Sequence, residues 1–214
     1  MILDLYVITD EGLAGGLPHS EIARRAVLGG ADAIQLRDKT LPPRDMVRVG
    51  REIREITRSA GAFFIVNDRL DIALACGADG IHLGQDDMMC CTARQLSPAG
   101  FIIGASVGSV DEALDAERQG ADYVAVSPVF STGSKANAGP GYGLATVGEI
   151  RAAVSIPVIA IGGIGPANAA DVIGAGADGI AVISAVVSQP DITAAARDLA
   201  AIIAAAKRAR RGSP

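Results

Sequence analysis

The chain has 214 residues, half of them apolar and 3% aromatic, with no Trp and a formal net charge of −5, a balance that argues against a nucleic-acid-binding surface. Its three Cys residues form no Cys-x-x-Cys pair, which argues against a structural zinc site and favours a reduced, cytoplasmic protein. The sequence shows neither a basic leader nor a long apolar segment, so no signal peptide or membrane span is expected.

Eight short apolar runs follow one another along the chain, and each has the composition of a strand buried on both faces. They cover residues 5–9, 33–36, 63–66, 80–83, 102–105, 123–126, 157–161 and 179–182. Helical patterns lie between them, at residues 41–60, 111–119, 148–154, 167–173 and 192–209. Because aromatic residues are few, the core is expected to be filled with Ala, Val, Ile and Leu.

The tripeptide Gly-Ala-Asp occurs four times, directly before the second, fourth, sixth and eighth runs, at residues 30–32, 77–79, 120–122 and 176–178. A repeat of this length fits two βα units, so four copies predict a single α/β domain over residues 1–214, a (β/α)8 TIM barrel. Each Gly stands where a helix end is expected, so the tripeptides are interpreted as turn structure. The chemistry of such a barrel lies where its strands end.

Polar side chains lie at the end of the second run and directly after it. Gln35, Arg37 and Lys39 alternate, which would place two cations and an amide on one side of an extended chain and suit a polyanion. The alternative is a charged loop that is paired internally through Asp38.

Carboxylates follow the third and fourth runs. Asp68 and Asp87 could jointly hold Mg²⁺, a hard cation that prefers oxygen ligands, with Asn67 on the substrate. On sequence alone Asp86 could take the place of Asp87. The alternative is that Asp68 and Asp87 are helix N-caps.

The fifth run is followed by Ser106, which is interpreted as a ligand donor and not as a nucleophile, because no base is evident beside it. The chain has two His residues. We expect His19 to lie on the surface. His82, inside the fourth run, either faces the barrel interior as a ligand donor or is a hydrogen-bonded core residue, and the second interpretation is favoured.

A long connection rich in Gly and Ser, residues 127–146, follows the sixth run and has the character of a binding loop. Its Thr132, Ser134 and Lys135 suit a phosphate group. Gly162 and Gly163 after the seventh run, with Ser184 after the eighth, form a second candidate phosphate site. The alternative for the two Gly residues is a turn that barrel packing requires.

Taken together, these residues resemble the thiamine-phosphate synthase family. The matching segments are YVITD at 6–10, QLRDK at 35–39, VNDR at 66–69, DGIHLGQDD at 79–87, GAS at 104–106, TGSK at 132–135, PVIAIGGI at 157–164 and GADGIAVISA at 176–185. QLRDK, the Asn-Asp pair and HLGQDD in this order are specific, whereas the Gly-rich stretches fit many phosphate-binding barrels. The long loop departs from the family, with Ser131 in place of Pro and Ser134 in place of Thr.

The resemblance implies transfer of a hydroxymethylpyrimidine group from its diphosphate to the nitrogen of thiazole phosphate, through a carbocation-like step that requires Mg²⁺ and releases pyrophosphate. It implies that the metal is bound by Asp68 and Asp87. The implied substrate contacts are Arg37, Lys39, Asn67 and Lys135 for the diphosphate, Gln35 and Ser106 for the pyrimidine, and Thr132, Ser134, Gly163, Ile183 and Ser184 for the thiazole phosphate. Of these, Arg37, Lys39, Ser106 and Lys135 would act in catalysis.

The sequence leaves three other functions open. A thiazole tautomerase-like barrel would need acid–base residues, and a non-catalytic regulator that binds thiamine precursors is favoured only by the atypical loop. A phosphosugar isomerase would leave Asp68 and Asp87 unused. The retained cations and carboxylates favour the synthase, whose partners would be its two small substrates, with no nucleic acid or membrane. A homo-oligomer is compatible with the sequence.

Overall fold

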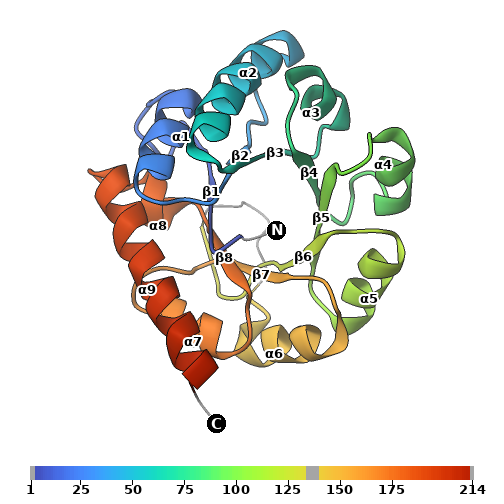
Figure 1. Ribbon diagram of the computed structural model, residues 1–214, viewed down its shortest axis with the longest axis vertical. Helices are drawn as coiled ribbons and strands as arrows, with labels where there is room; N and C mark the ends of the chain where they lie inside the picture. The colour runs from blue at the N-terminus through green and yellow to red at the C-terminus, as the bar shows by residue number, and fades with distance from the viewer. Residues whose placement is uncertain (1–2, 134–139, 213–214) are drawn as a thin grey trace.

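The computed structural model describes residues 3–133 and 140–212. Eight parallel strands pair in chain order and β8 pairs with β1, which closes a barrel surrounded by helices (Figure 1). The predicted (β/α)8 barrel is therefore confirmed. The strands are β1 (Leu5–Ile8), β2 (Ala33–Leu36), β3 (Phe63–Asn67), β4 (Gly80–Leu83), β5 (Ile102–Val107), β6 (Tyr123–Val126), β7 (Val158–Ile161) and β8 (Gly179–Val182).

The described helices are α1 (His19–Leu28), α2 (Pro43–Ala60), α3 (Leu70–Cys76), α4 (Cys90–Leu96), α5 (Val110–Arg118), α6 (Gly143–Ala153), α7 (Ala169–Gly174), α8 (Ser184–Val187) and α9 (Ile192–Gly212). Helix α6 begins five residues before the predicted start at 148. Gly143 and Gly148 weaken the helical signal, but burial of Val147 and Ile150 stabilises the longer helix. No helix within the described ranges is long and apolar enough to cross a membrane.

Helix α9 closes the outer ring, where it packs between α7 and α1 (Figure 1). The Thr193 hydroxyl donates to the carbonyl of Arg25 in α1, at 3.0 Å. Near the other end of α9, Arg210 donates to the carbonyls of Ile173 and Ala177, and Lys207 contacts Asp4 just before β1. The last helix therefore joins the beginning and the end of the barrel.

The four Gly-Ala-Asp tripeptides share one geometry at the amino-terminal end of the barrel. Their Gly residues have positive φ angles of 98°, 70°, 89° and 119°, which other residues rarely adopt. Each Asp carboxylate accepts the backbone N–H of a residue at the start of the preceding strand and returns its own N–H to that residue's carbonyl. The pairs are Asp32 with Leu5, Asp79 with Phe64, Asp122 with Ile103 and Asp178 with Val158, with carboxylate distances of 2.7–3.0 Å.

Most buried strand residues are the aliphatic residues expected for the core, with Phe64 of β3 as an aromatic residue packed toward α2, and all eight strands are largely buried. The inside of the barrel corrects the prediction of a purely aliphatic core. Tyr6, Gln35, His82 and Tyr123 lie there and are buried. Two of the chain's few aromatic residues are thus concentrated in one layer, together with two polar side chains.

Asp79→Ala should lower the free energy of unfolding by about 2 kcal/mol, because the buried Phe64 N–H and the Arg54 guanidinium, both within 2.8 Å of the carboxylate, lose a charged acceptor. Urea denaturation followed by circular dichroism measures the change. The matched control is Asp198→Ala on the exposed side of α9, where a change within about 0.5 kcal/mol is expected. An equal loss of unfolding free energy in Asp79→Ala and Asp198→Ala would contradict a stabilising role for the Asp79 carboxylate.

Candidate active site

A cavity of about 510 Å³ opens at the carboxyl-terminal ends of strands β2 to β8. It brings together ten of the predicted site residues, namely Arg37, Lys39, Asn67, Asp68, Asp87, Ser106, Thr132, Gly163, Ile183 and Ser184. Gln35 lies deeper, in a small extension below the cavity. Ser134 and Lys135 lie outside the described residues. The two predicted anion sites therefore line one continuous space.

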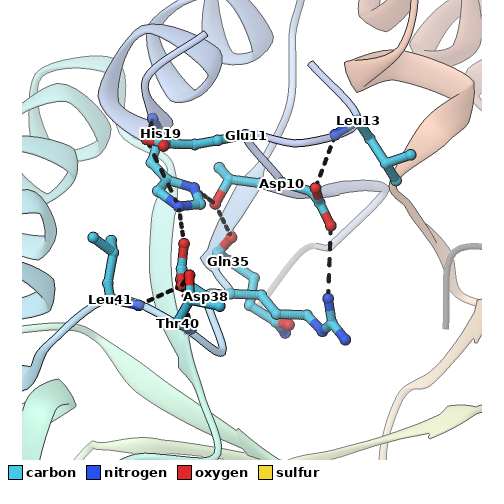
Figure 2. Close-up of polar contacts among 10 residues, drawn as sticks. Asp10, Glu11, Leu13, His19, Gln35, Asp38, Thr40 and Leu41 are labelled. Carbon is cyan, nitrogen blue, oxygen red and sulfur yellow. Dashed lines mark hydrogen bonds and ion pairs between the residues drawn. The ribbon is translucent and has the colours of Figure 1, made fainter. Parts of the chain in front are cut away.

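The cations of the β2–α2 loop pair with carboxylates of other loops. Lys39 Nζ lies 2.6 Å from Asp68 Oδ2, and an Arg37 guanidinium nitrogen lies 3.7 Å from Asp10 Oδ2. The alternative of a loop paired internally through Asp38 is wrong, because the Asp38 carboxylate contacts His19 and the loop backbone instead (Figure 2). Arg37 and Lys39 line the cavity and can meet an anion there.

The surface position expected for His19 is also wrong. This side chain is 1% exposed and lies between the β1–α1 and β2–α2 loops (Figure 2). Burial opposes ionisation of its partner Asp38, but backbone N–H groups of Leu41 and Thr40, together with His19, lower the Asp38 pKa to about 2. Asp38 is therefore an ionised acceptor at neutral pH.

Asp68 and Asp87 face each other across the ends of β3 and β4. Burial raises the pKa of Asp87, and the neighbouring Asp68 raises it further; for Asp68, hydrogen bonds from Lys39 and Asp87 outweigh burial and lower the pKa. Two adjacent carboxylates repel unless a proton or a cation lies between them. Two carboxylates beside the Asn67 amide are oxygen donors of the kind Mg²⁺ accepts, so these residues fit such an ion. Within the described ranges, no group of three or more His, Cys, Asp or Glu residues could hold a metal.

The backbone at Asp68 is unusual. Its φ angle is 61°, in the left-handed region that costs a non-Gly residue about 1 kcal/mol or more. The capping alternative is wrong for both carboxylates, since α3 and α4 begin after Arg69 and Met89 and neither helix has a side-chain cap. Asp87 Oδ2 instead accepts the Gly84 N–H at 2.7 Å. Exposed Asp86 also lines the cavity, but Asp87 is the residue whose carboxyl is hydrogen-bonded to Asp68.

A hydrogen-bonded chain crosses the floor of the cavity. Gln35 Nε2 donates to the Tyr6 hydroxyl at 2.7 Å, and the Tyr6 and Tyr123 hydroxyls are 3.3 Å apart. Tyr123 lies 3.0 Å from His82 Nδ1, and His82 Nε2 lies 2.9 Å from Ser106 Oγ. Burial raises the pKa of both Tyr hydroxyls, so both keep their protons. His82 is thus hydrogen-bonded and buried, as favoured, and it also faces the barrel interior, where it lines the small extension below the cavity.

The contact between His82 and Ser106 corrects the view that no base lies beside this Ser. The order of donors nevertheless argues against a nucleophile. If each Tyr proton is donated along the chain away from Gln35, His82 Nδ1 accepts from Tyr123 and Nε2 donates to Ser106. A ring nitrogen that donates to Ser106 cannot remove its proton. In that order of donors, Ser106 keeps its own proton and can donate it into the cavity, as a ligand donor does.

The opposite wall is backbone-rich. Gly162 and Gly163 have φ angles of 103° and 64°, and a Cβ on either would lie within 2.8 Å of residues 128–131. This packing supports the alternative that the turn itself requires the two Gly residues. Because Gly162, Gly163 and Ser184 line the same cavity, a phosphate site there stays a prediction. Ser184 opens the four-residue helix α8 and lines the same cavity.

Comparison with known proteins agrees with this arrangement. Residues 5–186 match the family model described as thiamine monophosphate synthase. The chain belongs to this family. It is similar to the thiamine-phosphate synthases of Methanoregula boonei, with 64% identity over 97% of this chain and 96% of that protein, and of Methanoculleus marisnigri, with 64% identity over 95% and 97%. A solved thiamine phosphate pyrophosphorylase from Pyrococcus furiosus superposes with a TM-score of 0.88 at 46% identity, over 95% of this chain and 96% of that one.

Membership of the thiamine monophosphate synthase family makes the chain an enzyme of the transferase class, in thiamine biosynthesis. Asp10, Tyr6 and Tyr123 contact predicted site residues or their partners, although the sequence alone did not indicate them as site residues. A signal existed for the two Tyr residues, since each stands near the start of an apolar run in a chain with only three Tyr in total. Continuous apolar runs do not show which residues face the barrel interior, so this signal alone could not place them.

Gly104→Ala should lower the free energy of unfolding by about 3 kcal/mol, because an added Cβ would lie 2.0 Å from the Tyr123 ring and disrupt the floor. The control is Gly174→Ala at the end of α7, where no atom lies within 4 Å and a change below about 1 kcal/mol is expected. Urea denaturation measures both. If Gly104→Ala is as stable as the control, the ring is not fixed against β5.

Proposed function

We propose that the chain is a thiamine-phosphate synthase that transfers a hydroxymethylpyrimidine group from its diphosphate to the nitrogen of thiazole phosphate. The observation that carries the proposal is the shared cavity. Arg37, Lys39, Asp68 and Asp87 line one side of it, and Thr132, Gly163, Ile183 and Ser184 line another. Two phosphorylated substrates that must meet for group transfer need an arrangement of this kind. Family membership and the high identity to named synthases support the same reaction.

The roles of the side chains follow from the chemistry. Loss of pyrophosphate leaves a carbocation-like centre and a departing polyanion, and fixed cations stabilise that anion as its charge develops. Arg37 and Lys39 are the cations of the described cavity wall, and Asn67 can donate to the same group. Asp68 and Asp87 would hold Mg²⁺, which adds positive charge beside the diphosphate. The attacking nitrogen carries no proton, so the reaction needs no general base.

The pyrimidine would lie above the polar floor. Ser106, left with a proton to donate, and the Gln35 carbonyl, left as an acceptor, would bind a ring nitrogen and an exocyclic amino group. The thiazole phosphate would lie against Gly163 and Ser184, and Ser134 and Lys135 keep their proposed roles on the long loop. We place the reaction in the cytoplasm, as the reduced Cys residues favour.

The test is to incubate the purified protein with both phosphorylated precursors and Mg²⁺ and to measure thiamine phosphate and pyrophosphate, which should form in equal amounts. EDTA should stop the reaction, and excess Mg²⁺ should restore it. Asp87→Asn should lower kcat about 100-fold because it removes one of the paired carboxylates.

The matched control is Asp71→Asn on α3, whose carboxylate pairs with Arg69 outside the cavity. Its turnover should stay within about threefold of wild type. No product from the wild-type protein, beside an active synthase in parallel, would overturn the proposed function. Full turnover by Asp87→Asn would overturn the metal assignment alone.

A further inference from the structure

His19 is a buried, polar residue to which the proposed reaction gives no role. It is the first residue of α1, is 1% exposed and does not line the cavity. Its Nδ1 lies 2.7 Å from the hydroxyl of Thr9, and its Nε2 lies 3.1 Å from Asp38 Oδ2 (Figure 2). Its backbone N–H donates to Glu11 Oε1 at 2.9 Å. A buried imidazole with both nitrogens engaged is held in one orientation.

The two carboxylate oxygens of Asp38 contact different parts of the protein, its own loop and the start of α1. Oδ1 accepts the backbone N–H groups of Thr40 and Leu41, at 2.6 and 2.7 Å, and thereby folds its own loop. Oδ2 reaches across to His19 on the β1–α1 side. Because Asp38 is ionised and cannot donate, His19 Nε2 must carry the proton of this bond. The contact is therefore a hydrogen bond to a charged acceptor, which is stronger than a neutral one.

Asp38 stands between the two cations that line the cavity, Arg37 and Lys39. The other contacts of those cations are weak anchors for the loop. The ion pair between Arg37 and Asp10 measures 3.7 Å, and the Lys39 side chain is 61% exposed. The bond from His19 to Asp38 is a largely buried polar connection between this loop and the start of α1, and it acts beside the apolar packing of Leu41 against the core.

We propose that His19 is a positioning residue for the anion-binding loop, residues 37–41: through Asp38 it holds the loop in the conformation that presents Arg37 and Lys39 to a diphosphate. This inference rests on the proposed function for the identity of the anion. Ordering the loop before the anion arrives lowers the entropy lost on binding, so the effect belongs to anion affinity. His19 touches no substrate and takes no part in the chemical step.

Two substitutions separate this role from simple packing. In His19→Gln the side-chain amide reaches about as far as Nε2 and can still donate to Asp38, whereas in His19→Asn the shorter amide matches Nδ1 and can reach only Thr9. If His19 acts through Asp38, the His19→Gln variant should keep the anion affinity of the wild type, and the His19→Asn variant should lose it. If His19 acts only by packing or through Thr9, the His19→Asn variant should bind the anion better than the His19→Gln variant.

The first measurement is binding of inorganic pyrophosphate in the presence of Mg²⁺, by calorimetry. His19→Asn should weaken binding about tenfold, and His19→Gln should stay within about threefold of wild type. In turnover assays His19→Asn should raise KM for the pyrimidine diphosphate by a similar factor. KM for thiazole phosphate should stay within about twofold.

The second measurement needs no ligand. Amide hydrogen exchange of Thr40 and Leu41, whose N–H groups donate to Asp38, should be about tenfold faster in His19→Asn than in wild type or His19→Gln. Asp79→Ala, which weakens the opposite end of the barrel, is the control for lost stability and should leave these two amides and the pyrophosphate affinity at wild-type values.

Wild-type binding and exchange in His19→Asn would overturn the inference, as would equal losses in Asn and Gln. If His19→Asn does not fold, Asp38→Ala removes the same bond from the exposed loop and should give the same split between the two KM values; an unchanged KM for the pyrimidine diphosphate then overturns the inference. If the wild-type protein binds no pyrophosphate and makes no product, the proposed function fails, and hydrogen exchange still decides whether His19 orders the loop.

Discussion

The closed barrel depends on a repeated bond at its amino-terminal end. In each Gly-Ala-Asp tripeptide the Asp carboxylate holds the N–H of a neighbouring strand, and its own N–H returns to the same residue. Strands are thereby joined in pairs where each pair begins, which fixes their register before they reach the cavity. Cations such as Arg54 and Arg94 pair with these carboxylates at that same end. The four carboxylate bonds and the cavity thus lie at opposite ends of the barrel.

The cavity end is built on a different principle. Like charges meet at Asp68 and Asp87, the backbone at Asp68 is strained, and a polar chain replaces the aliphatic layer beneath. Each feature opposes folding when considered alone. The four Asp carboxylate bonds at the other end of the barrel offset these costs, because they hold the strands that carry the unfavourable features in register.

The barrel could be predicted from the sequence because each copy of the Gly-Ala-Asp repeat marks two βα units, and four copies give eight. The sequence also predicted most residues of the cavity, since the carboxyl ends of parallel strands must share one face. It could not predict the contact of His19 with Asp38, which depends on the path of two loops across each other. Nor could it predict the floor, because a continuous apolar run hides which residues point inward; only the folded curvature of the sheet brings Tyr6 within reach of Tyr123.

The chain of hydrogen bonds from Gln35 to Ser106 has a consequence for how recognition can change. If its protons are all donated away from Gln35, the acceptor at one end and the donor at the other are set together. A ring whose edge offered the opposite order of donor and acceptor would require every proton between them to turn, and the amide of Gln35 to flip. In the proposed reaction, discrimination between such rings would therefore depend on all five side chains of this hydrogen-bonded chain together.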